Sequence, residues 1–236
     1  MIEKFGFDQA VPVDSKHLIE MLRERGFDVR DEMFEAGYAL DHVMPIAMPT
    51  DRADEDMFTI EDPAFLGIRF GFCVEIPSRN VSLSARAILK AGSPDRFGVR
   101  AIDFVMAAQR NARPVIKSYE ELGVPGIAEH GLSGMDVMLW AVTTEDKISG
   151  AGALISPKLP YLIKEKIGTD KFYLIPSSIH ELIVVPEFDG MSDSFITNML
   201  ATVMLVNAIL LPKEDFLTDN VFHYDGTRFS TVLNTF

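Results

Sequence analysis

In one stretch of the sequence, FLGIRFGFCVEI (residues 65–76), apolar residues recur at every second position. Every even position from 66 to 76 is apolar, whereas the odd positions include Arg69 and Glu75. A period of two is typical of a β-strand with one buried face, because successive side chains of a strand point to opposite sides. The chain therefore needs a sheet that packs at least one face against other elements.

Short apolar runs predict more strands in the second half of the chain. They lie at residues 135–144, 148–156, 171–176, 181–186 and 220–233. Antiparallel neighbours can be joined by short loops, whereas parallel neighbours need a long crossover, so these runs favour antiparallel pairing. The last run contains Asp225-Gly226, a pair suited to the positive dihedral angles of a type I′ hairpin turn.

Helical spacing of apolar residues, with capping residues at the ends, predicts five helices. They lie at residues 14–26, 83–92, 93–111, 157–168 and 192–211. The predicted fold class is α+β, with helices packed on a mostly antiparallel sheet and an α-rich N-terminal portion. We expect residues 135–236 to form one antiparallel sheet with two helices on one face, the helix at 193–211 being the most buried.

The predicted domain organisation separates an N-terminal portion, residues 1–64, from an α+β domain, residues 65–236. The alternative is one continuous domain that includes both. Residues 31–62 carry ten acidic residues against Arg52. The prolines and methionines of HVMPIAMPTDRADEDMF (residues 42–58) predict an irregular connector within this acidic segment.

The composition predicts a soluble cytoplasmic protein. Hydrophobic residues make up 47% of the chain, which is enough for a packed core. The formal charge of −13 opposes unspecific binding to nucleic acid or to an anionic membrane. The N-terminal residues lack the apolar segment of a signal peptide, and the apolar run at 199–211 is shorter than the ~20 residues of a bilayer span.

The sequence predicts no metal site and no cofactor. Cys73 is the single cysteine, and none of the five histidines stands at the spacing of a common metal motif. The glycines of SGAGA (residues 149–153) follow a predicted hairpin turn and lead into a strand, whereas a dinucleotide-binding loop requires a helix after its glycines.

Ser177, Ser178, His180 and Glu181 are the candidate catalytic residues, and two interpretations stay open. On an extended strand, Ser178 and His180 would point to one face, as a nucleophile and its base would in a hydrolase. Alternatively, Ser178 caps one helical turn and Glu181 reaches back to it, with His180 bonded to the backbone. We favour this structural turn, because residues two apart on a strand do not reliably bring their side chains within hydrogen-bond distance.

Residues 79–117 form a basic segment in an otherwise acidic chain. Their basic residues outnumber Asp95 and Asp103 and include the candidate anion or nucleic-acid ligands Arg79, Arg86, Lys90, Arg96, Arg100, Arg110 and Arg113. One interpretation is a site for an acidic ligand or nucleic acid. We favour the other, in which the acidic residues 31–62 pack beside this segment and neutralise it.

The C-terminal hundred residues resemble a family of uncharacterised bacterial proteins, a domain of unknown function common in gut Firmicutes and their mobile elements. LWAVTTEDKISGAGALI, FYLIPSSIHELIVVP and LTDNVFHYD carry the resemblance. The second stretch contains the Pro-Ser-Ser-x-His-Glu motif, and the resemblance implies that its polar residues share one local structure across relatives. It implies no activity.

These observations lead to three hypotheses about function. The first is a cytoplasmic protein, encoded by a mobile element as the resemblance implies, that acts without catalysis by binding another macromolecule, and the expected partner is a protein. The second is a hydrolase that uses Ser178 or Ser177 with His180. The third is a nucleic-acid-binding protein that uses the basic segment 79–117.

Overall fold

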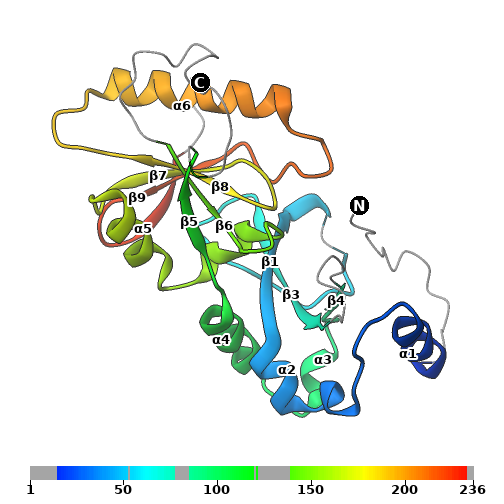
Figure 1. The fold of residues 1–236 in the computed structure, drawn as a ribbon. Helices are drawn as coiled ribbons and strands as arrows, with labels where there is room; N and C mark the ends of the chain where they lie inside the picture. Colours follow the sequence, from blue (N-terminus) through cyan, green and yellow to red (C-terminus); the bar gives the residue numbers. More distant parts are fainter. Residues whose placement is uncertain (1–14, 53, 78–84, 120, 122–138, 233–236) are drawn as a thin grey trace.

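A computed structural model describes residues 15–52, 54–77, 85–119, 121 and 139–232 of the chain. Figure 1 shows two antiparallel sheets, one in the lower part of the view and the other above it. Helices cover both sheets. The predicted α+β class is confirmed.

The first sheet is built on β3 (Ile68–Ile76), the strand predicted from the alternating residues. Three strands pair with β3, and all three pairs are antiparallel. They are β1 (Val43–Pro49), β2 (Thr59–Glu61) and β4 (Ala85–Ile88). β1 and β2 precede residue 65 and β3 follows it. Strand pairing therefore joins the two portions of the chain that the sequence analysis separates.

Two predictions in this sheet are wrong. The expected irregular connector contains β1. Its two prolines lack the backbone N–H group that pairing needs, but among the described strands β1 is an edge strand that pairs only with β3, so the prolines are tolerated. The expected helix at 83–92 contains β4, and Val74 pairs with Ala87. Alanine and leucine favour helices, but pairing with a neighbouring strand overrides this weak preference.

The second sheet has the strand order β10-β9-β7-β8-β6-β5, with every neighbouring pair antiparallel. Its strands are β5 (Val115–Ser118), β6 (Trp140–Thr143), β7 (Phe172–Pro176), β8 (Leu182–Pro186), β9 (Val221–Tyr224) and β10 (Phe229–Val232). The sheet thus extends beyond the predicted 135–236 limit to include β5.

The hairpin between β9 and β10 is confirmed, but its turn type differs from the prediction. Tyr224 pairs with Phe229, and the Asp225 N–H donates to the Arg228 carbonyl, so Gly226 and Thr227 are the central residues. Gly226 has a positive φ of 94°, whereas a type I′ turn needs positive φ at both central residues.

The expected strand at 148–156 is also wrong. Residues Gly150–Ile155 form a short 3-10 helix, η4, in which every residue is buried. A Cβ at Gly152 would collide with the Pro45 carbonyl oxygen and lie 2.7 Å from the Pro45 carbonyl carbon. The glycine thus allows η4 to pack directly on the backbone of β1.

The two helices of the second sheet lie on opposite faces, contrary to the expectation of one face. α5 (Leu159–Ile167), which ends at Gly168 as predicted, packs with Leu174 and Val184. α6 (Asp193–Leu210) packs with Ile175 and Val185, the neighbours that point to the other side. The apolar runs of β7 and β8 are therefore continuous because both faces of these strands are covered.

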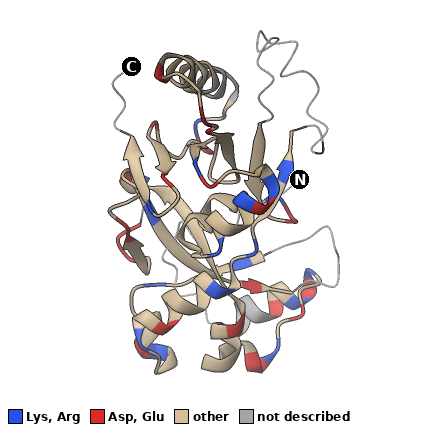
Figure 2. Ribbon diagram, turned by 90° about the vertical axis from the view of Figure 1, so that its left-hand side faces the viewer, with Lys and Arg blue, Asp and Glu red and all other residues tan. Residues whose placement is uncertain are grey.

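α6 is not the most buried helix. Ile196, Met199 and Leu200 contact the sheet, but Leu205 and Ile209 are 63% and 71% exposed. Figure 2 shows α6 with much of its ribbon in tan, and Asp193 in the first turn is its one acidic residue. Within the described residues, no helix is long and apolar enough to cross a membrane.

One hydrophobic core connects the two sheets. It contains Phe70 and Phe72 of β3, Phe104 of α4, and Phe172 and Phe222 of the second sheet. The remaining helices are α1 (Ser15–Glu24), η1 (Asp31–Phe34), α2 (Ala36–His42), η2 (Thr50–Arg52), α3 (Ser93–Phe97) and α4 (Ala101–Asn111). α3 and α4 divide the predicted helix at 93–111, because Gly98 adopts a left-handed conformation between them.

Candidate functional site

The turn between β7 and β8 contains the candidate residues Ser177, Ser178, His180 and Glu181. The Ser178 hydroxyl accepts hydrogen bonds from the backbone N–H groups of His180 (3.0 Å) and Glu181 (3.2 Å). The Ser178 N–H donates to the Glu181 carbonyl (3.1 Å). Both serines are buried, at 8% and 6% exposed. Ser178 therefore caps the turn as the structural interpretation expects, although the turn is not helical.

Glu181 does not close a capping box with its side chain. Its Oε1 atom instead accepts a hydrogen bond from the Tyr119 hydroxyl at 3.5 Å. Burial raises the pKa of the Tyr119 hydroxyl, and the negative charge of Glu181 raises it further. Tyr119 directly follows β5 and is distant from the turn in the sequence, so no local motif could identify it.

His180 connects the turn to the loop that follows β6. Its Nδ1 atom accepts a hydrogen bond from the Ser149 N–H (3.1 Å), so the proton of the neutral ring lies on Nε2. Nε2 lies 3.5 Å from Asp215 Oδ1. The His180 carbonyl accepts hydrogen bonds from the Thr143 hydroxyl (3.1 Å) and the Gly150 N–H (3.0 Å). His180 is thus partly buried and has both side-chain and backbone partners.

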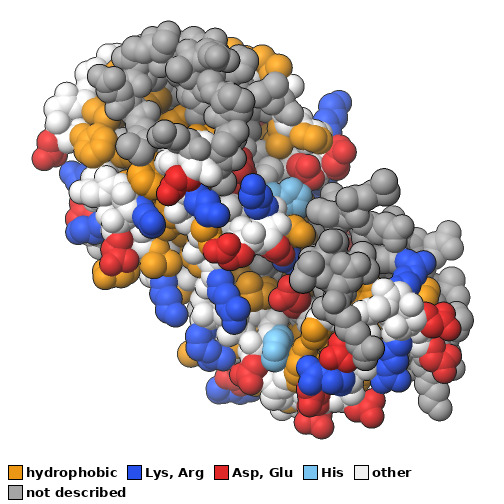
Figure 3. All heavy atoms as spheres, in the orientation of Figure 1, with side chains coloured by type: hydrophobic (Ala, Val, Ile, Leu, Met, Phe, Trp, Pro, Cys, Tyr) orange, Lys and Arg blue, Asp and Glu red, His pale blue; other side chains and the backbone are white. Residues whose placement is uncertain are grey.

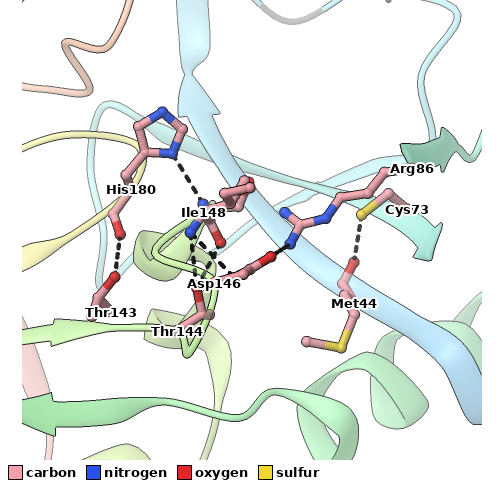
Figure 4. Close-up of polar contacts among 9 residues, drawn as sticks. Met44, Cys73, Arg86, Thr143, Thr144, Asp146, Ile148 and His180 are labelled. Atoms are coloured by element: carbon pink, nitrogen blue, oxygen red, sulfur yellow. Dashed lines mark hydrogen bonds and ion pairs between the residues drawn. The ribbon is translucent and has the colours of Figure 1, made fainter. Parts of the chain in front are cut away.

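Residues 144–149 form a tight loop between His180 and Arg86, as Figure 4 shows. Asp146 Oδ1 accepts hydrogen bonds from the Thr144 hydroxyl (2.6 Å) and the Ile148 N–H (3.2 Å). Lys147 and Ser149 have positive φ angles of 58° and 56°. This conformation is uncommon for residues other than glycine, and here the surrounding hydrogen bonds hold it.

Arg86 links the same loop to the first sheet. Its Nη2 atom lies 2.8 Å from Asp146 Oδ2, and the Arg86 side chain is only 16% exposed. In the described part of the chain, the buried Arg86 Nε has no hydrogen-bond partner. Cys73 lies nearby on β3 (Figure 4), and burial raises the pKa of its thiol to about 11.

The geometry does not assemble a nucleophile and a base from Ser178 and His180. The serine hydroxyl is directed to two backbone N–H groups, and the imidazole nitrogens face Ser149 and Asp215. Among the described contacts, no hydrogen bond joins the Ser178 hydroxyl to the His180 ring. The arrangement instead attaches the 177–181 turn to three segments that are distant in the sequence, namely the loop at 144–149 and the segments that contain Asp215 and Tyr119. Asp146, Asp215 and Tyr119 complete it, and the sequence analysis missed all three.

The described residues contain no group of three or more His, Cys, Asp or Glu side chains that could hold a metal ion. His223 has a carboxylate partner, Glu187, with 2.7 Å between Nε2 and Oε2. Tyr173 stacks on the His223 ring with 4.5 Å between ring centroids. This pair lies at the surface of the second sheet and is separate from the 177–181 turn.

The basic candidates divide into paired and unpaired residues. Arg86 pairs with Asp146, Lys90 with Asp54 (2.9 Å), and Arg100 with Asp103 (2.6 Å). Asp54 is the one partner among them that belongs to residues 31–62, so that segment supplies little of the expected neutralisation.

Arg96, Arg110 and Arg113 are exposed and form no ion pair within the described residues, while Arg79 lies outside them. Figure 3 shows Lys and Arg side chains over the region of α4 and β5. On α4 itself, Ile102 and Met106 are 51% and 57% exposed. Large apolar side chains and unpaired arginines therefore share one helix and the residues next to it.

Two antiparallel sheets with a shared core define the fold of this chain as α+β. A family model described as "Family of unknown function (DUF5688)" matches residues 99–226, just over half of the chain. The protein therefore belongs to this family. The match agrees with the predicted resemblance to a domain of unknown function and begins earlier, at α4. No curated protein and no solved structure matches the chain.

Proposed function

We propose that this protein acts by binding another protein, and that it does so in the bacterial cytoplasm. The outer face of α4 is the observation that carries this proposal. Ile102 and Met106 are about half exposed there, whereas Phe104, Ala107 and Ala108 of the same helix are buried. Single exposed apolar residues are common on protein surfaces, but two on adjacent turns form the start of an apolar patch.

The 177–181 turn supports binding over catalysis. Hydrolysis would need the Ser178 hydroxyl within hydrogen-bond distance of a base, at about 2.6–3.2 Å. That hydroxyl already accepts two backbone N–H groups, and His180 Nδ1 accepts a third. Moving either side chain into a catalytic pair would leave partly buried N–H groups without partners, which opposes the rearrangement.

Cytoplasmic location is part of the proposal because of the cysteine content. Cys73 is the single cysteine and is buried in β3, so the fold is stabilised without a disulfide. Secreted domains often rely on disulfides, whereas cytoplasmic proteins keep their thiols reduced.

A photo-crosslinking experiment tests protein binding. The full-length protein would carry benzoylphenylalanine in place of Met106 on α4, or in place of Tyr161 on α5 as a control. Tyr161 is 64% exposed and therefore equally accessible. Irradiation in cells of the native host should give a discrete protein adduct from position 106 and not from position 161. Adducts with nucleic acid, equal adducts from both positions, or no protein adduct would overturn the proposal.

A further inference from the structure

The exposed side of α4 continues from apolar into basic residues. Ile102, Met106 and Arg110 follow one another at intervals of four residues, which places them about 40° apart around the helix. The opposite side of α4 faces α2 and β1, where Asn111 donates hydrogen bonds to the carbonyls of Leu40 in α2 (2.8 Å) and Val43 in β1 (3.1 Å). The Ile102–Met106–Arg110 stripe therefore points away from the core.

The basic end of this stripe has no carboxylate partner in the part of the chain that the structure describes. Arg110 and Arg113 are exposed, and neither forms an ion pair there. The contrast with Arg100 is direct, because Asp103 accepts two of its hydrogen bonds, at 2.8 and 2.6 Å. Arginine remains charged at neutral pH, so two positive charges are available next to two aliphatic side chains.

We propose that Ile102, Met106, Arg110 and Arg113 together bind an acidic protein segment that carries aliphatic side chains. The aliphatic groups of the partner would pack on Ile102 and Met106, and its carboxylates would pair with the two guanidinium groups. Charge complementarity selects this partner, since guanidinium groups bind carboxylates in a bidentate manner. This inference rests on the protein-binding function proposed above and specifies the partner's chemistry.

Nucleic acid fits the same surface less well. Binding at physiological salt requires several phosphate contacts, and three of the seven candidate basic residues are already paired with carboxylates of this chain. Single-stranded nucleic acids also use aromatic side chains for base stacking, whereas Ile102 and Met106 are aliphatic.

Charge reversal combined with the crosslinking experiment tests the inference. The segment that crosslinks at position 106 would be identified by mass spectrometry, synthesised as a fluorescent peptide, and titrated with the full-length protein by anisotropy. Arg110→Glu/Arg113→Glu should weaken binding at least tenfold. Lys158→Glu/Lys166→Glu changes the formal charge equally at exposed residues of the α5 region and should leave binding within twofold of wild type.

A complementary exchange completes the test. Replacing the acidic residues of the peptide by lysine should restore binding to the Arg110→Glu/Arg113→Glu variant. Circular dichroism and gel filtration establish that both protein variants are folded. A crosslinked protein segment without acidic residues, or equal effects of the two double variants, would overturn the acidic partner and leave protein binding intact. If no protein crosslinks at position 106, protein binding itself is wrong and the inference falls with it.

Discussion

The Ser178 hydroxyl accepts hydrogen bonds from two backbone N–H groups in the turn between β7 and β8. Such a hydroxyl supplies an acceptor to N–H groups that no neighbouring strand pairs with in the turn. The sequence predicted this role from the position of Ser178 before His180 and Glu181. It could not predict Tyr119, Asp146 or Asp215, because their positions depend on how distant loops fold together.

Replacing Ser178 by alanine tests the structural role of the turn. We expect Ser178→Ala to lower the free energy of unfolding by about 0.5–2 kcal/mol, because both N–H groups lose their acceptor. Urea denaturation followed by circular dichroism measures the change. Ser230→Ala, at an exposed position of β10, is the matched control and should change stability little. Wild-type stability in Ser178→Ala, together with loss of an ester, phosphoester or peptide hydrolysis, would support the hydrolase hypothesis instead.

At the level of helices and strands, sequence patterns correctly predicted the elements whose conformation depends mainly on their own residues. β3, α5 and the β9–β10 hairpin have clear periodicity or turn residues, and the structure contains all three. The patterns failed for β4 and η4, because strand pairing and backbone contact with other elements decide their conformation. α5 and α6 cover opposite faces of β7 and β8. Because these strands are apolar on both faces, their sequence does not specify which helix covers which face.

The contact between η4 and β1 gives a second prediction. Gly152→Ala would force a methyl group against the Pro45 carbonyl, so we expect a loss of about 1–3 kcal/mol or more in the free energy of unfolding. Gly37→Ala, in α2, is the control because nothing lies within 4 Å of the added Cβ. It should stabilise the protein by about 0.5–1 kcal/mol through its better helix propensity. Equal effects of the two substitutions in thermal denaturation would contradict the close packing of η4.

For the whole molecule, the shared hydrophobic core implies that the two sheets unfold together. Phe65, between the sheets, contacts Phe70 of the first sheet (5.9 Å between ring centroids) and Phe222 of the second (5.2 Å). Cooperative unfolding is expected when the main core of a molecule is built from both of its parts. We therefore propose that residues 1–64 and 65–236 fold as one continuous domain.

Two intrinsic probes can test this cooperativity. Trp140, the single tryptophan, lies in β6 of the second sheet, and Cys73 lies in β3 of the first. In the folded protein, burial and the raised pKa of about 11 keep the Cys73 thiol protonated at pH 8, so it should react with a thiol reagent only after unfolding. We expect Trp140 fluorescence and Cys73 reactivity to give the same urea midpoint. Reaction of Cys73 at a lower urea concentration would indicate that the first sheet unfolds independently.

The backbone contact between Gly152 and Pro45 also restricts how this chain can evolve. Gly152 lies inside the stretch that matches the family model, whereas Pro45 lies outside it. A larger side chain at position 152 can be accommodated only if the strand that contains Pro45 moves away. Among relatives that share both sheets, position 152 should therefore remain glycine whatever residue stands at position 45, and the N-terminal strand should diverge no faster than η4, on which it rests.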